Sequence, residues 1–487
     1  MLEQSVDLFQ FPLQCAKDQY VQQLEFQCSA SPNQLLARTR DILTLRQDPT
    51  FVQTKLQELR SLQKDEELLR GRIVSDTTKA AEGQIFWTGV HTRCLNTIPY
   101  LITIMVFCKI YLFPALGLLS PLLLFIAPYI LLRTMFDGGA NMPLDVYITI
   151  MKQMVLGIQP GQPMTLKQIG QLVWMVLSLG QGMIQPFWTA YHTSTLDKTI
   201  LARAAALHRI ANITKELQTY FLQRDISINC MLRVPEIPQE PHEAAAWLDD
   251  EPLGLVILWK LLGNMSILLT VAEDARWKPV QWTSGSEFEL DDFADLAIDT
   301  KKAVRNYLAL ENHAILTGPN RGGKSSNLRG ILQQVLLGQT FGCTFMCRGT
   351  WKPFGYIATR LKSYDNAGKE SLFEMEVRHA ATMLHKIQQD KINSLILIDE
   401  LFHSTNPPDA ETSAVLFLEQ LWELHHVKSI VSTHIFRLCQ TPAQMVVPLC
   451  CPATLQEDGS ILYTYELTPG ICTTSSVQEV LEEAGMI

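Results

Sequence analysis

The chain has 487 residues and a formal net charge of -9, with 40 lysine and arginine residues against 49 aspartate and glutamate residues. This acidic balance argues against a protein that coats nucleic acid through bulk positive charge, because phosphate neutralisation supplies most non-specific affinity. The 11 cysteines form no Cys-x-x-Cys pair. We therefore expect free thiols, no zinc site and a reducing compartment such as the cytoplasm or nucleus.

The first segment with a clear pattern is a set of amphipathic helices. Between Ser31 and Leu69, apolar residues recur at helical spacing, and Asp48-Pro49 is typical of the start of a new helix. We assign residues 1–80 to the first part of a helical core. Its cationic side chains are candidates for a local groove that binds DNA, although such residues more often form a solvated helix face. These candidates are Arg38, Arg40, Arg46, Lys55, Arg60 and Arg70.

Residues 98–132 are almost entirely apolar, and residues 110–132 contain no charge. About 20 such residues in a helix can cross a bilayer core about 30 Å thick. The run Phe113-Pro114-Ala115-Leu116-Gly117 favours a hairpin of two shorter segments, whose ends would return to the same side. We predict that this hairpin contacts a membrane. A buried helical pair or a dimer contact is the alternative, because Pro114, Pro121 and Pro128 break a simple helix.

We assign residues 81–192 to an insertion that contains this apolar stretch. Its part from Gly157 to Trp188 fits an interfacial helix, although we expect amphipathic packing in a protein core there. Residues 193–275 follow as a returning core or lever, because Thr193 to Leu232 has the composition of a long helix. A linker between this segment and the rest of the chain is marked by Pro235, Pro238 and Pro241.

A glycine-rich segment follows the apolar run from Ala314 to Thr317. It reads Gly318-Pro319-Asn320-Arg321-Gly322-Gly323-Lys324-Ser325-Ser326 and contains a complete G-x-x-x-x-G-K-S phosphate loop. Its glycines allow backbone N–H groups to surround phosphate oxygens, and the following helix adds the positive end of its dipole. Lys324 should reach the β and γ phosphates, and Ser325 should bind Mg²⁺. We therefore predict a site for a nucleoside triphosphate with Mg²⁺.

A second motif lies downstream, where Ser394 to Ile398 has the pattern of a buried parallel strand that ends in Asp399 and Glu400. Asp399 would hold the Mg²⁺ shell, and Glu400 would orient or deprotonate the attacking water. An apolar strand that ends in two carboxylates is also common as a purely structural element. The phosphate loop upstream favours the catalytic interpretation.

Together with three further segments, these motifs resemble the MutS mismatch-repair ATPases. Thr317 to Arg329 resembles that family's T-G-P-N-M-G-G-K-S-T-x-L-R, with Arg321 in place of methionine. Gly368 to Glu376 resembles its G-x-S-x-F-x-x-E segment, and Thr405 to Ala410 resembles its turn after the acidic strand. Ser432 to Leu438 is similar to its A-T-H-Y-F-E-L segment.

The resemblance implies an α/β P-loop ATPase domain of the ABC type over residues 276–487, preceded by an α-helical core or lever with an apolar helical insertion. It implies a homodimer that binds and hydrolyses ATP with Mg²⁺ and couples this to mismatched, branched or damaged DNA. Ser371 would serve the nucleotide of the opposite subunit, and His434 would sense the γ phosphate. Ala303 stands where the family has an aromatic residue that stacks on adenine.

The family's mismatch reader, an N-terminal domain with a Phe-x-Glu wedge, has no counterpart in this sequence. The family resemblance favours the DNA-acting ATPase, which we adopt with DNA as the default partner. The absent reader and the acidic charge favour a second hypothesis. In that hypothesis the protein is a membrane-anchored mechanical ATPase or scaffold of the MutS fold that does not read DNA.

Overall fold

The chain divides into two compact units. Unit 1 comprises Met1–Gln63, Glu216–Leu232 and Trp259–Ile487, and unit 2 comprises Lys64–Lys215 and Arg233–Leu258. Unit 1 thus draws on the first, third and fourth segments expected from the sequence, whose boundaries stay a prediction. The computed structural model describes residues 9–26, 31–71, 83, 85–87, 89, 91–135, 143–156, 165–227, 232–360, 372–402, 404–435, 437–440, 445–456 and 460–486.

Unit 1 is built on a six-stranded sheet in the order β14-β11-β5-β10-β9-β8. Neighbouring strands run parallel except for the β11 and β14 pair. Every residue of β5, β9 and β10 is buried, as expected for a parallel sheet covered on both faces. The strands are β5 (His313–Thr317), β8 (Tyr356–Arg360), β9 (Ser394–Ile398), β10 (Val427–Ser432), β11 (Val446–Cys450) and β14 (Thr468–Pro469).

Alternate residues of these strands point to opposite faces of the sheet. Ala314 and Leu316 of β5 join the core formed with α12 (Lys324–Phe341). Ile315, between them, joins a second core formed with α13 (Leu372–Asp390) and α14 (Pro407–Trp422). The central strand is therefore held by helices on both sides, which fixes the position of its carboxyl end.

A smaller four-stranded sheet, in the order β2-β7-β3-β4, lies against α12 and shares its core. Two further pairs are antiparallel, β1 with β6 and β12 with β13. Two short helices flank the last four strands in the sequence: α15 (Arg437–Gln440) precedes β11, and α16 (Val477–Glu483) follows β14. The remaining strands are β1 (Trp277–Pro279), β2 (Gln281–Trp282), β3 (Phe288–Phe293), β4 (Asn306–Ala309), β6 (Cys343–Phe345), β7 (Arg348–Trp351), β12 (Ala453–Leu455) and β13 (Ile461–Tyr463).

Gly338 of α12 has no room for a side chain, since a Cβ there would lie 2.4 Å from Cζ2 of Trp351 and 2.9 Å from Cγ2 of Val280. Trp351 is fully buried and cannot move aside cheaply. We expect Gly338→Ala to lower the free energy of unfolding by about 1–3 kcal/mol, although alanine normally favours a helix over glycine. Urea denaturation followed by tryptophan fluorescence measures the change.

The control for this substitution is Gly285→Ala, in an exposed turn where the nearest atom to a new Cβ is Oγ1 of Thr283 at 3.4 Å. It should change the free energy of unfolding by no more than about 0.5 kcal/mol. Equal stability of the two variants would contradict the tight packing of Trp351 on α12.

The helices expected near the start of the chain are present. They are α1 (Gln14–Phe26), α2 (Pro32–Arg46), α3 (Pro49–Ser61) and α4 (Gln63–Arg70). Asp48 caps α3 by accepting a hydrogen bond from the backbone N–H of Phe51 at 3.2 Å, as the Asp-Pro signal predicts. α11 (Pro252–Glu273) is the long apolar helix that precedes β1.

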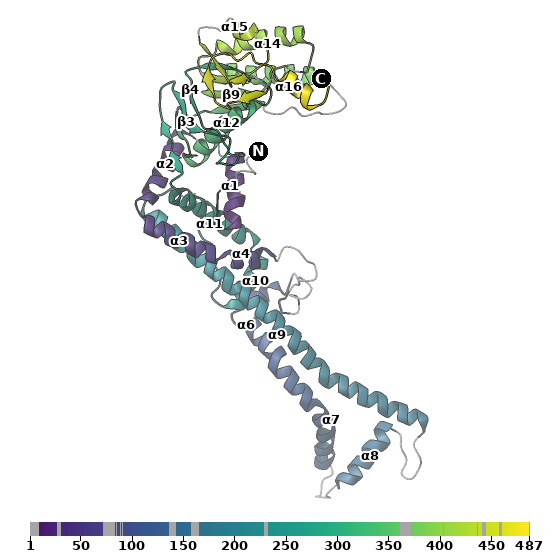
Figure 1. Cartoon of the computed structure of the whole chain (residues 1–487). Helices are drawn as coiled ribbons and strands as arrows, with labels where there is room; N and C mark the ends of the chain where they lie inside the picture. Colours follow the sequence, from purple (N-terminus) through teal and green to yellow (C-terminus); the bar gives the residue numbers. More distant parts are fainter. Residues whose placement is uncertain are drawn as a thin grey trace. The chain divides into compact units, whose positions relative to one another are not determined.

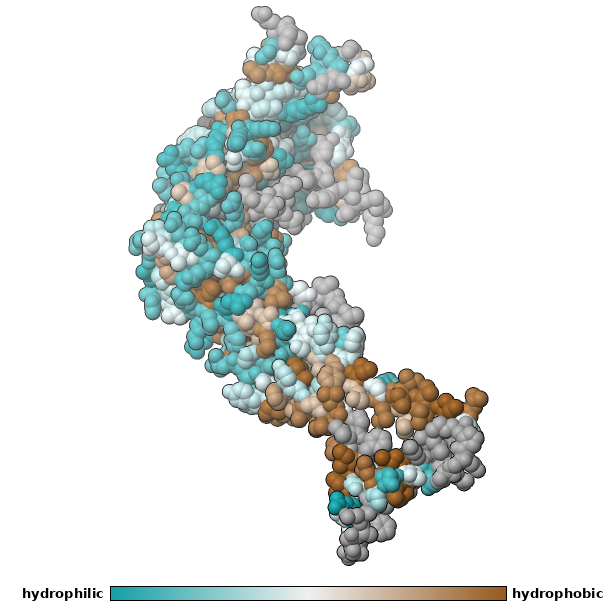
Figure 2. All heavy atoms as spheres, turned by 60° about the horizontal axis from the view of Figure 1, so that its bottom comes forward, coloured by the Kyte–Doolittle hydropathy of each residue, from teal (hydrophilic) through white to brown (hydrophobic). Residues whose placement is uncertain are grey.

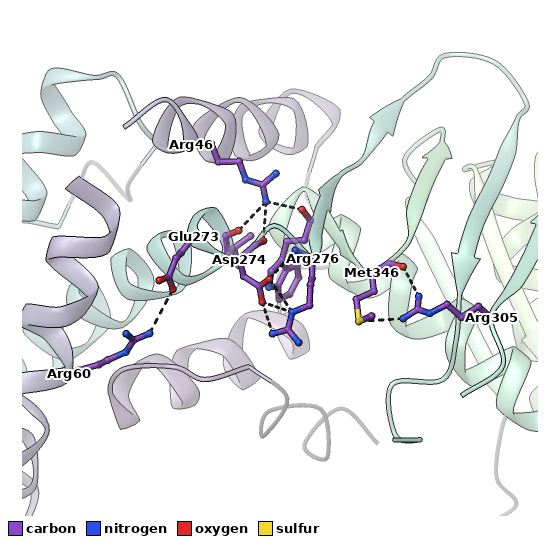
Figure 3. A network of polar contacts seen from close by, with 9 residues as sticks. Arg46, Arg60, Glu273, Asp274, Arg276, Arg305 and Met346 are labelled. Atoms are coloured by element: carbon purple, nitrogen blue, oxygen red, sulfur yellow. Dashed lines mark hydrogen bonds and ion pairs between the residues drawn. The ribbon is translucent and has the colours of Figure 1, made fainter. Parts of the chain in front are cut away.

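The six cations considered for a DNA-binding groove are instead engaged within the fold. Arg46 donates to four main-chain carbonyl oxygens at the end of α11 and beyond it, at 2.7–3.3 Å (Figure 3). It thereby satisfies acceptors that a helix C-terminus leaves open. Arg60 pairs with Glu273 at 3.7 Å (Figure 3). The other partners are Gln339 for Arg38, Asp225 for Arg40, Glu58 and Glu216 for Lys55, and Glu66 for Arg70. These side chains do not form a free basic groove.

In unit 2, α6 (Leu101–Phe107), the five-residue π-helical segment η4 (Cys108–Leu112) and α7 (Phe113–Met135) follow one another without a break. The hairpin predicted at residues 113–117 is therefore wrong, because the chain continues through them as one helical segment (Figure 1). A π turn lies before Pro114 and includes the carbonyl four residues before it, where a proline ring would clash in a regular helix. α7 then continues through Pro121 and Pro128 as a regular α-helix.

Two further helices complete the apolar part of unit 2. α8 (Leu144–Leu156) is followed by α9 (Leu166–Gln223), a helix of 58 residues that begins well before the expected Thr193. Core packing was expected for Gly157 to Trp188, but in the described part, from residue 165, most apolar side chains are exposed. That expectation is wrong, because no other described element covers this part of α9.

The polar end of unit 2 has its own small core. Ile102 and Val106 of α6 pack there with Ile200 and Ala204 of α9 and with α10 (Pro241–Asp250). The short helix η3 (Arg93–Thr97) lies beside α10, and Arg93 forms an ion pair with Asp250. Unit 2 therefore has one end with ordinary protein packing and one end without it.

Candidate nucleotide site

The glycine-rich loop lies at the carboxyl end of β5, between Thr317 and the first residue of α12, Lys324. Gly323 has a φ of 97°, in the region that favours glycine. A Cβ there would lie 3.2 Å from the ring of Tyr465. Glycine thus allows both the turn and a close approach of an aromatic ring. The turn directs the N-terminus of α12, with its free N–H groups and positive dipole end, toward the loop.

Lys324 is almost completely buried at the start of α12. Its Nζ donates hydrogen bonds to the carbonyl oxygens of Gly318 at 2.9 Å and Pro319 at 3.1 Å. Burial lowers the pKa of Lys324, while the nearby carboxylates of Glu400 and Asp399 act to raise it. A buried cation beside a glycine-rich loop at a helix N-terminus suits a polyanionic ligand.

Asp399 and Glu400 follow β9, and they meet the end of the neighbouring strand β10. The hydroxyl of Ser432 donates to Oδ1 of Asp399 at 2.5 Å and accepts from the backbone N–H of Glu400 at 3.0 Å. Glu400 has a φ of 57°, a conformation that costs energy outside glycine and is concentrated at functional sites. The end of β10 therefore holds both acidic residues in position.

His434, just after β10, completes the group. Its Nε2 lies 3.3 Å from Oε1 of Glu400 and 3.4 Å from Nζ of Lys324. Three side chains from three segments of the sequence thus come together at one edge of the sheet. This is a consequence of strand order, because β5, β10 and β9 are parallel neighbours and their carboxyl ends share that edge.

A cavity of about 420 Å³ opens beside the loop. Its wall includes Pro319 to Asn327, Glu400, Ala303 and Tyr465. Ser325 is among these residues, and its hydroxyl with the Asp399 carboxylate gives the type of oxygen donor that Mg²⁺ prefers. Mg²⁺ takes most of its other ligands from phosphates and water, so two protein oxygens fit its needs. In the described part of the chain, no cluster of three or more His, Cys, Asp or Glu residues could hold a metal ion.

Tyr465 is one of the residues of this cavity that sequence reasoning missed, with Asp295, Ile298 and Lys302. Asn306 holds its segment: the side-chain Nδ2 donates to the Tyr465 carbonyl at 3.2 Å, and Oδ1 accepts from the N–H of Leu467 at 2.7 Å. Tyr465 has a φ of 58° and a half-exposed ring. An exposed aromatic face in a nucleotide-sized cavity can stack on a base. The signal available in the sequence was the pair of aromatic residues Tyr463 and Tyr465.

The remaining expected residues are placed as follows. Ser326 accepts a hydrogen bond from Arg329 at 3.1 Å, so its hydroxyl is bound to a neighbour on α12. Arg329 in turn pairs with the buried Asp295 at 2.8 Å. Ser371 lies outside the described residues. The loop residues expected at the phosphates, which are Gly318, Pro319, Asn320, Arg321, Gly322, Gly323, Lys324 and Ser325, all lie between β5 and the first turn of α12.

Residues 314–486 match the family model described as MutS domain V. This part of the chain is therefore similar to domain V of the MutS family. The matched part runs from the central strand β5 to α16 and contains the loop, both acidic residues, His434 and Tyr465. It confirms the resemblance to the MutS family that the motifs indicated.

A relative supports the same assignment. The DNA mismatch repair protein MSH1, mitochondrial, of Arabidopsis thaliana is 31% identical over 194 residues. This alignment covers 39% of the present chain and 17% of that protein. The chain therefore spans only a small part of the relative that it matches.

Proposed function

We propose that the chain is a MutS-type ATPase that binds ATP with Mg²⁺ beside the glycine-rich loop and hydrolyses it. The observation that carries this proposal is the meeting of Lys324, Glu400 and His434 at one edge of the sheet in a MutS domain V. Loss of turnover in variants of these residues tests it, and the two decisive variants are described in the Discussion.

The proposed roles follow from position. Lys324 and the N-terminus of α12 bind the β and γ phosphates, and Ser325 with Asp399 binds Mg²⁺. Mg²⁺ supplies charge neutralisation on the phosphate oxygens. Glu400 orients the attacking water and accepts its proton. His434 contacts both Lys324 and Glu400, so it can link the state of the γ phosphate to the water-activating carboxylate.

The proposal includes a homodimer, in which Ser371 of one subunit serves the nucleotide of the other. It rests on the resemblance of Gly368 to Glu376 to the family segment, of which residues 368–371, including Ser371, lie outside the described residues. ATP that contacts both subunits would bind the closed dimer better than the open one, and this difference in affinity would drive closure.

DNA is the proposed partner, on the strength of the family and of the relative's name. The steady-state rate of ATP hydrolysis at low salt, with and without duplex, mismatched and branched DNA, tests this. We expect at least one DNA to stimulate the rate, with Lys324→Ala as the background control. A rate unchanged by every DNA would remove DNA from the proposal and leave the ATPase. The relative's name also adds the mitochondrion to the cytoplasm and nucleus as a proposed setting.

Tyr465 is proposed to stack on the adenine in the absence of an aromatic side chain at Ala303. We expect Tyr465→Ala to weaken ATP binding about 2- to 12-fold, the equivalent of about 0.5–1.5 kcal/mol for an aromatic pair. Tyr465→Phe keeps the ring and should bind as the wild type does. Fluorescence titration measures both, and binding of inorganic tripolyphosphate, which has no base, should be the same for all three proteins. An equal loss for tripolyphosphate would contradict stacking.

A second candidate function retains the ATPase but replaces DNA by a membrane, on which the protein acts as a mechanical ATPase or scaffold. The engagement of the six candidate cations inside the fold favours it, as does the apolar surface of unit 2. The DNA stimulation assay separates the two candidates.

A further inference from the structure

One end of unit 2 exposes far more apolar surface than a soluble domain normally does. Figure 2 shows hydrophobic atoms gathered over the end of unit 2 that contains α7 and α8. On α7 the exposed side chains include Leu116, Leu119, Leu123, Ile126 and Ile130, and on α9 they include Val176, Leu177 and Ile184. Full burial of such a side chain stabilises a protein by about 1.5–3 kcal/mol relative to full exposure. A partner that covers these side chains is therefore expected.

Two helical stretches of the described chain are long and apolar enough to cross a membrane. Pro252–Glu273 is 61% buried and includes core residues such as Leu261 and Leu262, so it is explained as a core helix. Leu101–Leu119 is only 17% buried. Its α6 part contributes Ile102 and Val106 to the small core of unit 2, so protein packing fails to account only for the part of this stretch that follows α6.

α7 and the first part of α9 meet at one point and diverge from it toward α8 (Figure 1). They touch where a Cβ on Gly117 would lie 3.0 Å from Cγ of Pro186. A small residue at such a contact allows two helices to approach closely, as in membrane helix pairs. Residues on both helices can be counted from this shared point, so positions the same number of residues from it, toward α8, lie at comparable depths.

Exposed aromatic side chains gather at one level near this contact. Tyr111 and Phe113 precede Gly117 by six and four residues, and Trp188 and Tyr191 follow Pro186 by two and five residues. All four rings are more than half exposed. Tyrosine and tryptophan are enriched where a bilayer meets water, so this level marks one interface.

A second aromatic level lies deeper along both helices. Tyr129 of α7 is in contact with Tyr147 of α8, with ring centroids 5.1 Å apart, and Trp174 of α9 is 73% exposed. At a rise of 1.5 Å per residue, Tyr111 to Tyr129 and Trp174 to Tyr191 each span about 26 Å. Two helices thus give the same spacing, which is close to the roughly 30 Å of a bilayer core.

Charged residues of α7 and of the first part of α9 lie outside the two aromatic levels. Residues 110–132 and 168–196 contain no aspartate, glutamate, lysine or arginine. Lys109 and Asp197 lie just outside one aromatic level, and Arg133 and Lys167 lie just outside the other. The polar residues between the levels, such as Gln181 and Gln185, are uncharged. A band without charge and with charges at both edges matches the profile of lipid rather than of a protein partner.

We propose that α7 and the first part of α9 form a helical hairpin that crosses a lipid bilayer and places α8 on the far side. The hairpin anchors unit 2, whose polar core of α6, α10 and the later part of α9 stays on the near side. This proposal does not depend on nucleotide chemistry, so it and the proposed ATPase can fail separately.

Flotation of the full chain with phosphatidylcholine vesicles tests the proposal. The wild type should float with the vesicles, and Leu119→Arg/Ile184→Arg should reduce the floating fraction at least tenfold. Both side chains lie near mid-band and are 48% and 68% exposed, so the arginines disturb no described packing. The matched control is Leu455→Arg/Leu462→Arg, at exposed sites of unit 1, which should float as the wild type does.

Other outcomes of this experiment overturn the proposal. A wild type that stays unbound and forms a dimer, which the Leu119→Arg/Ile184→Arg variant disperses, would show that a second copy of the chain covers the apolar face. Equal flotation of the wild type and this variant would show that attachment lies elsewhere.

Thiol labelling in sealed vesicles distinguishes a crossing hairpin from one that lies on the surface. Cys94, exposed near the polar core of unit 2, should react with a membrane-impermeant maleimide at once. The thiol added by Thr149→Cys, at an exposed position of α8, should react only after the vesicles are permeabilised. Immediate reaction of the added thiol would overturn the crossing.

Discussion

Lys324→Ala is expected to reduce ATP turnover to background, a loss of about 10²–10³-fold or more, and to weaken ATP binding at least tenfold. The substitution removes a buried cation from the phosphate loop and leaves the carbonyl oxygens of Gly318 and Pro319 without their donor. Removal of one such electrostatic contact to a developing charge typically costs about this much in rate. Phosphate release and fluorescent nucleotide titration measure the two effects.

The matched control is Lys352→Ala, which removes the same charge from an exposed position outside the cavity. It should retain the turnover and the ATP affinity of the wild type. Turnover of Lys324→Ala within threefold of the wild type would mean that Lys324 does not bind the phosphates.

Glu400→Gln is expected to lower turnover by about 10²–10⁴-fold while leaving the affinity for ATP within about threefold. The amide has nearly the shape of the carboxylate and can still meet His434, 3.3 Å away, but it cannot take a proton from water. We expect ATP-bound dimers to accumulate, because ATP binding would close the dimer and the hydrolysis that opens it again would not occur. Single-turnover kinetics and sedimentation velocity with ATP measure these effects.

Glu423→Gln, an exposed glutamate just after α14, provides the control for charge. Unchanged ATP affinity in Glu400→Gln shows that its fold is intact, so a loss of turnover can be assigned to chemistry. Retained turnover in Glu400→Gln would contradict the assignment of Glu400 as the base.

Local motifs in this sequence predicted the elements that surround the loop. The run Ala314 to Thr317 lies in β5, and the strand before Asp399 is β9. These predictions succeed because a short buried parallel strand needs a continuous apolar run. A tight loop with positive φ at Gly323 likewise needs glycine. In both cases the residues themselves restrict the backbone.

Other predictions failed where contacts with a distant part of the chain, or with a partner, determine the structure. The proline-rich run at Phe113 to Gly117 breaks an ordinary helix, yet a π turn before Pro114 lets the helix continue. The apolar side chains at Gly157 to Trp188 look equally suited to a core, a bilayer or an interface, because hydrophobicity does not specify its partner. Arg46 looks like a surface cation, but the end of α11 supplies carbonyl acceptors for it.

The sequence by itself determined the glycine-rich loop, the acidic strand and the resemblance to the MutS family, since each depends on residues that are adjacent in the chain. Only the tertiary structure decided that His434 meets both Lys324 and Glu400, that Tyr465 lies in the same cavity as Ala303, and that Gly117 faces Pro186. The physical reason is that these contacts join segments far apart in sequence. Strand order and helix packing bring them together, and no local pattern encodes either.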